Sequence, residues 1–105
     1  MDIKQLQKLY NASESNVKWA KHCLERMQER DISINDVEPC LQTGEIIEDY
    51  PDDFPNPSCL IFGRTKENKI LHIVVGSDSS TLFFITAYFP NTDIFDEDLK
   101  TRKEQ

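Results

Sequence analysis

The chain has 105 residues, of which 38% are hydrophobic and 30% are charged, and its formal net charge is −7 at pH 7. This composition is typical of a folded globular chain, and a chain of this length buries roughly two-thirds of its unfolded surface in one core. The acidic balance argues against a nonspecific nucleic-acid-binding protein, whose usual footprint is a basic surface. No apolar run approaches the roughly 20 residues of a membrane span, and the N-terminus lacks a signal-peptide core. We therefore expect a cytoplasmic protein with no membrane partner.

The three cysteines, Cys23, Cys40 and Cys59, are an odd number with wide spacing, which suits reduced thiols better than a disulfide framework. Together with His22 and His72 they are ligand types that zinc prefers, but the chain has no CxxC or HxxxH pair. The sequence therefore predicts no metal and no cofactor, although a zinc set of His22, Cys23 and His72 stays open as an alternative.

The N-terminal stretch from Asp2 to Tyr10 has apolar residues at helical spacing. We expect residues 1–16 to form an N-terminal helical extension, and residues 17–105 to form a single α+β domain. A polar segment, Asn11–Ser15, separates the two.

The next helix is predicted over Val17–Ser33, because a helix there has one apolar stripe facing a core. This stripe consists of Val17, Ala20, Leu24 and Met27. The alternative is an extended entry, since Val17 and Trp19 alternate with the polar Lys18, followed by a helix that begins as late as Lys21.

A row of basic side chains is expected on the other side of this helix. His22, Arg26 and Arg30 are spaced four residues apart and rise one above another on a single helical face. Such a row suits a phosphate, because arginine offers a fixed fork of donors and histidine transfers protons near neutral pH. The competing interpretation is a solvated face whose arginines pair with Glu25, Glu29 or a neighbouring element.

After the helix predicted over Val17–Ser33, Ser33 and Asp36 predict the capped start of a further short helix. Gly44 lies where this helix needs a left-handed C-terminal cap. Beyond Gly44 the apolar spacing changes to two, which predicts strands. These strands are residues 45–50, 58–65, 69–76 and 81–89. Short connections between them indicate an antiparallel meander. The predicted fold is thus α+β, with N-terminal helices packed on a four-stranded antiparallel sheet.

One face of this sheet is expected to be apolar and to lie against the helices. Its members on the last two strands are Leu71, Ile73, Val75, Phe83, Ile85, Ala87 and Phe89. The other face is also largely apolar, which is more than a monomer usually exposes. We expect it to be covered by the first helix, by the tail from Asn91, by a second copy in a homodimer or by a partner protein.

That second face also holds a polar patch of Arg64, His72, Thr86 and Tyr88. Hairpin loops of about five residues place His72 opposite Phe62 on one side and Thr86 on the other. For His72, two interpretations stay open: a hydrogen-bonded residue of the core, and a residue with a functional role. For Tyr88, the two alternatives are a half-buried residue of the sheet and a catalytic acid.

Several short motifs in matching order resemble the family called domain of unknown function 4258, over about Val17 to Arg102. These motifs are His22-Cys23-Leu24-Glu25-Arg26-Met27 with Arg30 and Ile32-Ser33, then Gly44-Glu45-Ile46-Ile47 with Tyr50-Pro51, then Leu71-His72-Ile73-Val74, and Ile85-Thr86-Ala87-Tyr88 with Pro90. The chain departs from the pattern at Cys23, where alanine is common, and at Phe95, where tryptophan is common. The family is similar to the RelE/ParE-like toxins, whose fold places helices before a small antiparallel sheet.

The resemblance implies a RelE-like, metal-independent ribonuclease or toxin-like protein that acts on RNA, including RNA in a translating ribosome. Cleavage by the 2′-hydroxyl of the RNA needs a base, an acid and cations for the developing charge. The candidate catalytic residues are His22 or His72 for proton transfer, Arg26 and Arg64 for charge stabilisation, and Tyr88 for orientation or acid work. His22 and His72 belong to one site only if they share a side of the sheet or meet around its edge.

The alternative function is a non-catalytic interaction module that binds a partner protein through the apolar sheet face. In that case the row of His22, Arg26 and Arg30 would be structural and would tie the helix to an acidic neighbour such as Glu45 or Glu48.

Overall fold

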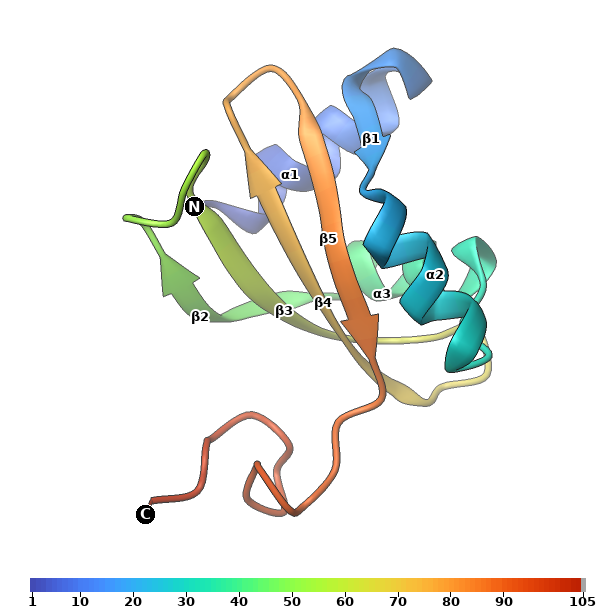
Figure 1. Cartoon of the computed structure of the whole chain (residues 1–105), viewed down its shortest axis with the longest axis vertical. Coiled ribbons are helices and arrows are strands. Elements are labelled where there is room, and N and C mark those ends of the chain that lie inside the picture. Colours follow the sequence, from blue (N-terminus) through green and yellow to red (C-terminus); the bar gives the residue numbers. More distant parts are fainter. Residues whose placement is uncertain (105) are drawn as a thin grey trace.

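A computed structural model of the protein describes residues 1–104. Within this range the chain forms three α-helices, one short 3-10 helix and a five-stranded mixed sheet in the order β1-β5-β4-β3-β2 (Figure 1). The elements are α1 (Ile3–Ala12), η1 (Glu14–Asn16), β1 (Val17–Trp19), α2 (Lys21–Glu29), α3 (Ile34–Gln42), β2 (Glu45–Tyr50), β3 (Ser58–Arg64), β4 (Ile70–Ser77) and β5 (Leu82–Tyr88). The α+β class is confirmed, and each of the four predicted strands is present within one residue of its predicted bounds.

Strand β1 is the main difference from the predicted fold. Residues 17–19 pair in parallel with β5, so the sheet has five strands and is mixed, and the prediction of four antiparallel strands is wrong. The Trp19 ring stacks on the Phe84 ring with centroids 4.1 Å apart, and the amide of Ala20 donates to the Phe84 carbonyl at 3.1 Å. These contacts hold the segment extended, and the alternative of a helix that begins at Lys21 is confirmed.

Helix α2 buries a face that shares only Met27 with the predicted stripe. Cys23 and Met27 are buried, whereas Leu24 is 43% exposed and Ala20 lies outside the helix as its N-cap. The expected burial of Leu24 and Ala20 is wrong because the later start changes which side of the helix meets β5.

The C-terminus of α2 ends in a tight turn at Asp31, whose φ of 58° lies in the left-handed region. The amide of Ile32 donates to the Met27 carbonyl at 2.8 Å and the amide of Asp31 donates to the Gln28 carbonyl at 3.3 Å, the pattern of a Schellman motif. This turn ends the helix at Arg30, and the side chain of Arg30 lies beside β5.

Helix α3 lies very close to β3, and two glycines permit this approach. A Cβ atom on Gly63 would lie 2.1 Å from the Cys40 carbonyl oxygen, and one on Gly44 would lie 2.5 Å from Cγ2 of Ile61. Gly44 does not have a positive φ, so the predicted left-handed cap is wrong, and close packing is the reason for glycine at this position.

The faces of β5 are set by a bulge at Ile85. Val75 pairs with Phe84, but Val74 pairs with Thr86, which leaves one extra residue in β5. Before the bulge, Leu82 and Phe84 join the core beneath the helices, and after it Ala87 does. The expectation that Phe83 and Ile85 face the helices is wrong for this reason.

The first helix joins the same core. Leu6 of α1 is buried among residues of the sheet and of α2 and α3, and the side-chain amide of Gln7 donates to the carbonyls of Leu41 at 3.0 Å and Gln42 at 3.2 Å. The division of the chain into residues 1–16 and 17–105 stays a prediction.

The tail, Asn91–Glu104, has neither a helix nor a strand, and it folds back under the sheet (Figure 1, red). Phe95 is 1% exposed and its ring lies against the ring of His72, on the face opposite to the helices. Of the covers that the sequence left open for this face, the tail is the one that lies over His72. None of the helices within residues 1–104 is long and apolar enough to cross a membrane.

Candidate functional site

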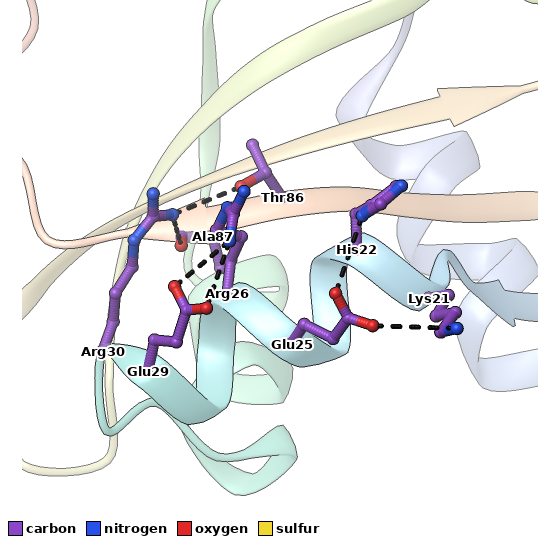
Figure 2. Close-up of polar contacts among 8 residues, drawn as sticks. All are labelled: Lys21, His22, Glu25, Arg26, Glu29, Arg30, Thr86 and Ala87. Atoms are coloured by element: carbon purple, nitrogen blue, oxygen red, sulfur yellow. Dashed lines mark hydrogen bonds and ion pairs between the residues drawn. The ribbon is translucent and has the colours of Figure 1, made fainter.

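The predicted basic row lies on the exposed side of α2 (Figure 2). The His22 side chain is 86% exposed, and its Nδ1 lies 3.7 Å from Oε2 of Glu25. Nη1 of Arg26 lies 3.1 Å from Oε1 of Glu29. His22 and Arg26 are therefore paired with carboxylates of their own helix, as the competing interpretation expected.

Arg30, the last member of the row, reaches around the edge of the sheet. Its Nη1 donates to the Ala87 carbonyl at 2.8 Å and to Oγ1 of Thr86 at 3.4 Å (Figure 2). This edge is open because β1 pairs only with residues 82–84 of β5, and the Ala87 carbonyl beyond them accepts from Arg30 instead of from a strand. The row on α2 thus continues onto the end of β5.

His72 is fully buried, and both of its ring nitrogens are hydrogen-bonded. Nε2 lies 2.7 Å from the Leu99 carbonyl and Nδ1 lies 3.2 Å from the Tyr88 hydroxyl. A carbonyl only accepts, so Nε2 carries the proton, and in the neutral ring Nδ1 accepts from Tyr88. Burial lowers the pKa of His72 below its ordinary value, although the bond to Leu99 and the charge of Glu48 oppose this shift. The hydrogen-bonded core histidine that the sequence left open is thus the arrangement observed.

Tyr88 is half-buried beside His72, and their pairing differs from the expected register. His72 lies opposite Phe62 on β3, as predicted, but opposite Tyr88 on β5, where Thr86 was expected. The shift of two residues has two causes: the β4–β5 hairpin loop has four residues, 78–81, instead of five, and the bulge adds one residue to β5. Burial raises the pKa of Tyr88, with Arg102 and Arg30 opposing the shift, so its hydroxyl suits orientation better than acid work.

Arg64 stands apart from the other candidates. It ends β3, its side chain is exposed, and its Nη1 lies 3.5 Å from the Asn68 carbonyl within the β3–β4 hairpin. The five candidate catalytic residues therefore separate into the pair His22 and Arg26 on α2, the pair His72 and Tyr88 beneath the tail, and Arg64 alone.

A family model described as Domain of unknown function (DUF4258) matches residues 19–89. The chain belongs to this family. The family resemblance read from the sequence motifs is confirmed. No curated protein and no solved structure matches the chain.

The DUF4258 match extends from Trp19 in β1 to Phe89 just after β5, so it includes the row on α2 and the pair of His72 and Tyr88. It leaves out α1 and the tail. The covering of His72 therefore depends on a segment outside the matched region.

The tail brings further charged groups to the DUF4258 sheet that were not among the sequence candidates. Nε of Arg102 donates to Oε2 of Glu48 at 2.8 Å, and the Tyr50 hydroxyl donates to the same carboxylate. Burial alone would raise the pKa of Glu48, but these two hydrogen bonds lower it below its ordinary value. Nζ of Lys100 lies 2.5 Å from Oε1 of Glu45.

These pairs correct the expectation that Glu45 or Glu48 would hold the basic row of α2, because their partners are Lys100 and Arg102 of the tail. Lys100 and Arg102 are two residues apart in the sequence, and this spacing was the available signal for their pairing with two acidic side chains on one face of a strand. A bulge in β2 hid the match, since it places two acidic residues three positions apart on the same face.

The cysteines of this DUF4258 protein are buried free thiols. Burial raises the pKa of Cys23 to about 11 and the pKa values of Cys40 and Cys59 to about 12. Among residues 1–104, no group of three or more histidine, cysteine or acidic side chains is placed to hold a metal ion. The thiols therefore act as small core residues.

Proposed function

We propose that the protein is a RelE-like, metal-independent ribonuclease that acts on RNA through the basic row of α2 and the adjoining end of β5. The observation that carries this proposal is the contact of Arg30 with Thr86 and the Ala87 carbonyl, because it joins the row and β5 into one continuous surface. Helices that precede the antiparallel strands β2 to β5 support a RelE/ParE-like arrangement.

The spacing of the row suits the backbone of RNA. Four residues of an α-helix rise about 6 Å, which is comparable with the distance between successive phosphates of an extended strand. A row formed by His22, Arg26 and Arg30 can therefore follow a bound strand along the helix. Exposed ion pairs such as Arg26 with Glu29 contribute only about 0–1 kcal/mol, so a phosphate competes readily for the guanidinium.

In the proposed reaction, the 2′-hydroxyl of the RNA attacks the adjacent phosphorus and expels the 5′-oxygen of the next nucleotide. His22 takes the proton from the attacking 2′-hydroxyl and gives a proton to the departing 5′-oxygen. Its ring is exposed and can therefore meet a bound strand. Arg26 and Arg30 stabilise the negative charge that develops on the phosphorane. Tyr88 and His72 hold the end of β5 in place as positioning residues.

The test is RNA integrity and protein output in a translating extract that receives the purified protein. We expect cleavage by the unaltered chain and its loss in the His22→Ala and Arg26→Ala variants. Lys21→Ala is the matched control, because Lys21 is 88% exposed on the same helix and also pairs with Glu25. Intact RNA at high protein concentration, or equal cleavage by all variants, would contradict the proposal.

A second candidate function is a non-catalytic module that binds a partner protein through the tail-covered sheet face. The carboxylate partners of His22 and Arg26 favour it, since paired cations are typical of a structural surface. This function predicts normal protein output in the same extract and a saturable protein complex whose formation depends on residues of the sheet face.

A further inference from the structure

The tail docks on the sheet as a separately folded turn. Its backbone hydrogen bonds close within itself: the Asp96 amide donates to the Thr101 carbonyl at 2.7 Å, and the Lys103 amide donates to the Ile94 carbonyl at 2.9 Å. The Asp98 carboxylate accepts from the amides of Lys100 and Thr101. The turn thus has its own internal framework and needs no strand as a partner.

The contacts between this turn and the sheet are made mainly by side chains. Within residues 1–104, the tail backbone makes one hydrogen bond to the strands, which the Leu99 carbonyl accepts from His72. Leu99 has a φ of 58°, a left-handed conformation that is strained for leucine and that accompanies this contact. Removal of the turn would therefore break no backbone ladder.

The surface beneath the turn is complementary to it in charge and in aromatic contacts. We call it the tail-binding face, formed by Glu45, Glu48, Phe62, His72 and Tyr88. The ring of Phe95 lies edge-on to the ring of His72 with centroids 4.7 Å apart. This buried aromatic contact anchors the turn.

Two cations of the tail complete the fit. Nζ of Lys100 lies 2.5 Å from Glu45 and 4.8 Å from the centroid of the Phe62 ring. Arg102 pairs with Glu48 at 2.8 Å, and within the tail its Cζ lies 5.1 Å from the centroid of the Phe95 ring. Carboxylates combined with an aromatic face are a favourable environment for a basic side chain.

We propose that the tail-binding face is a recognition surface for a segment of a partner protein that carries an aromatic anchor and a Lys-x-Arg arm, and that the tail occupies this surface as a displaceable internal ligand. The ion pairs of the arm are partly exposed, with the side chains of Lys100 and Arg102 41% and 52% accessible, so a competing arm can replace them one at a time. The proposal is independent of RNA cleavage, because its test measures the binding of a peptide.

The test uses the full chain with Lys100→Glu and Arg102→Glu together, which turns the attraction of the arm for Glu45 and Glu48 into repulsion. A fluorescent peptide of residues 91–104 serves as the probe in an anisotropy titration. We expect saturable binding to this variant, and binding at least tenfold weaker to the unaltered chain, whose own tail competes. A peptide with the same two reversals should bind the variant at least tenfold more weakly than the unaltered peptide.

A full chain with Lys66→Glu and Lys69→Glu is the matched control, because it has the same change in charge within the exposed β3–β4 hairpin and keeps the tail contacts. It should bind the peptide as weakly as the unaltered chain. Equal binding by the two peptides, or no saturable binding by the folded tail variant, would overturn the proposal.

If the charge reversal prevents folding, the milder pair Lys100→Gln and Arg102→Gln takes its place. Failure of both pairs to fold would overturn the proposal, because a displaceable segment is not essential to the fold. Formation of a dimer by exchange of tails between unaltered chains would overturn the choice of a partner protein in favour of a second copy.

Discussion

The two histidines lie in opposite surroundings although both carry the same chemistry. His22 on α2 is 86% exposed and has one carboxylate nearby, whereas His72 on β4 is fully buried and uses both ring nitrogens in hydrogen bonds. An exposed ring can exchange protons with a substrate, but a buried and saturated ring mainly holds its neighbours in place. Burial therefore decides whether the chemistry of each histidine is accessible to a substrate, and the catalysis that we propose belongs to the region of α2.

The largest difference between the two regions is expected in activity. Arg26→Ala removes a cation that meets the developing charge, and loss of one such donor lowers the rate by about 10²–10³-fold. RNA cleavage in a translating extract measures this effect. The free energy of unfolding should change by less than about 0.5 kcal/mol, because Arg26 is exposed and its ion pair lies on the surface. Lys21→Ala should retain cleavage.

The next effect concerns stability and lies at His72. His72→Phe keeps a ring but removes both nitrogens, so the Leu99 carbonyl and the Tyr88 hydroxyl lose their partners. Urea unfolding should show a loss of about 1–3 kcal/mol, the usual cost of an unsatisfied buried polar group. His22→Phe is the control and should change stability by less than about 0.5 kcal/mol. Equal effects of the two substitutions would contradict the structural role of His72.

The pH dependence of stability should separate the same two residues. Because burial lowers the pKa of His72 in the folded chain, the unfolded chain takes up a proton first as the pH falls below about 6.5. The free energy of unfolding should therefore be highest above this pH and should decline below it, until the folded pKa is reached. His72→Phe should remove this decline, and His22→Phe should leave it in place, in urea titrations between about pH 7 and pH 5.

The smallest effect on stability is expected from the exposed ion pair between Lys100 of the tail and Glu45. Lys100→Ala breaks the surface ion pair with Glu45 and should lower the free energy of unfolding by about 0–1 kcal/mol. The difference between the variant and the unaltered chain should shrink in high salt, because salt screens exposed charges. Lys66→Ala is the control and should show no such difference. A loss that persists unchanged in high salt would indicate that packing of the lysine stem, and not its charge, holds the tail.

Local patterns made much of this structure predictable. The strands follow from the period of two, and the row of His22, Arg26 and Arg30 follows from helical spacing alone. Residues 17–19 are too few to show a period, and their parallel pairing with β5 depends on distant residues. Helical spacing therefore extended the predicted helix over a strand.

The contacts of His72 could not be predicted because they depend on two nonlocal features. A four-residue β4–β5 hairpin loop, where five residues were expected, and a one-residue bulge in β5 together bring Tyr88 opposite His72 instead of Thr86. The tail that covers His72 has no regular period, so no pattern indicates where Phe95 and Leu99 lie. The sequence identified candidate residue types for a site, but their separation into two regions depends on tertiary structure.

The most direct test of the central claim is the chemistry of the RNA ends formed in a translating extract with the purified protein. Attack by the 2′-hydroxyl leaves a 2′,3′-cyclic phosphate on the upstream fragment. We predict new ends of this kind with the unaltered chain and their absence with His22→Ala, at equal protein concentration and stability. New ends that carry a 3′-hydroxyl, or cyclic phosphate ends that persist with His22→Ala, would contradict the assignment of the reaction to the basic row of α2.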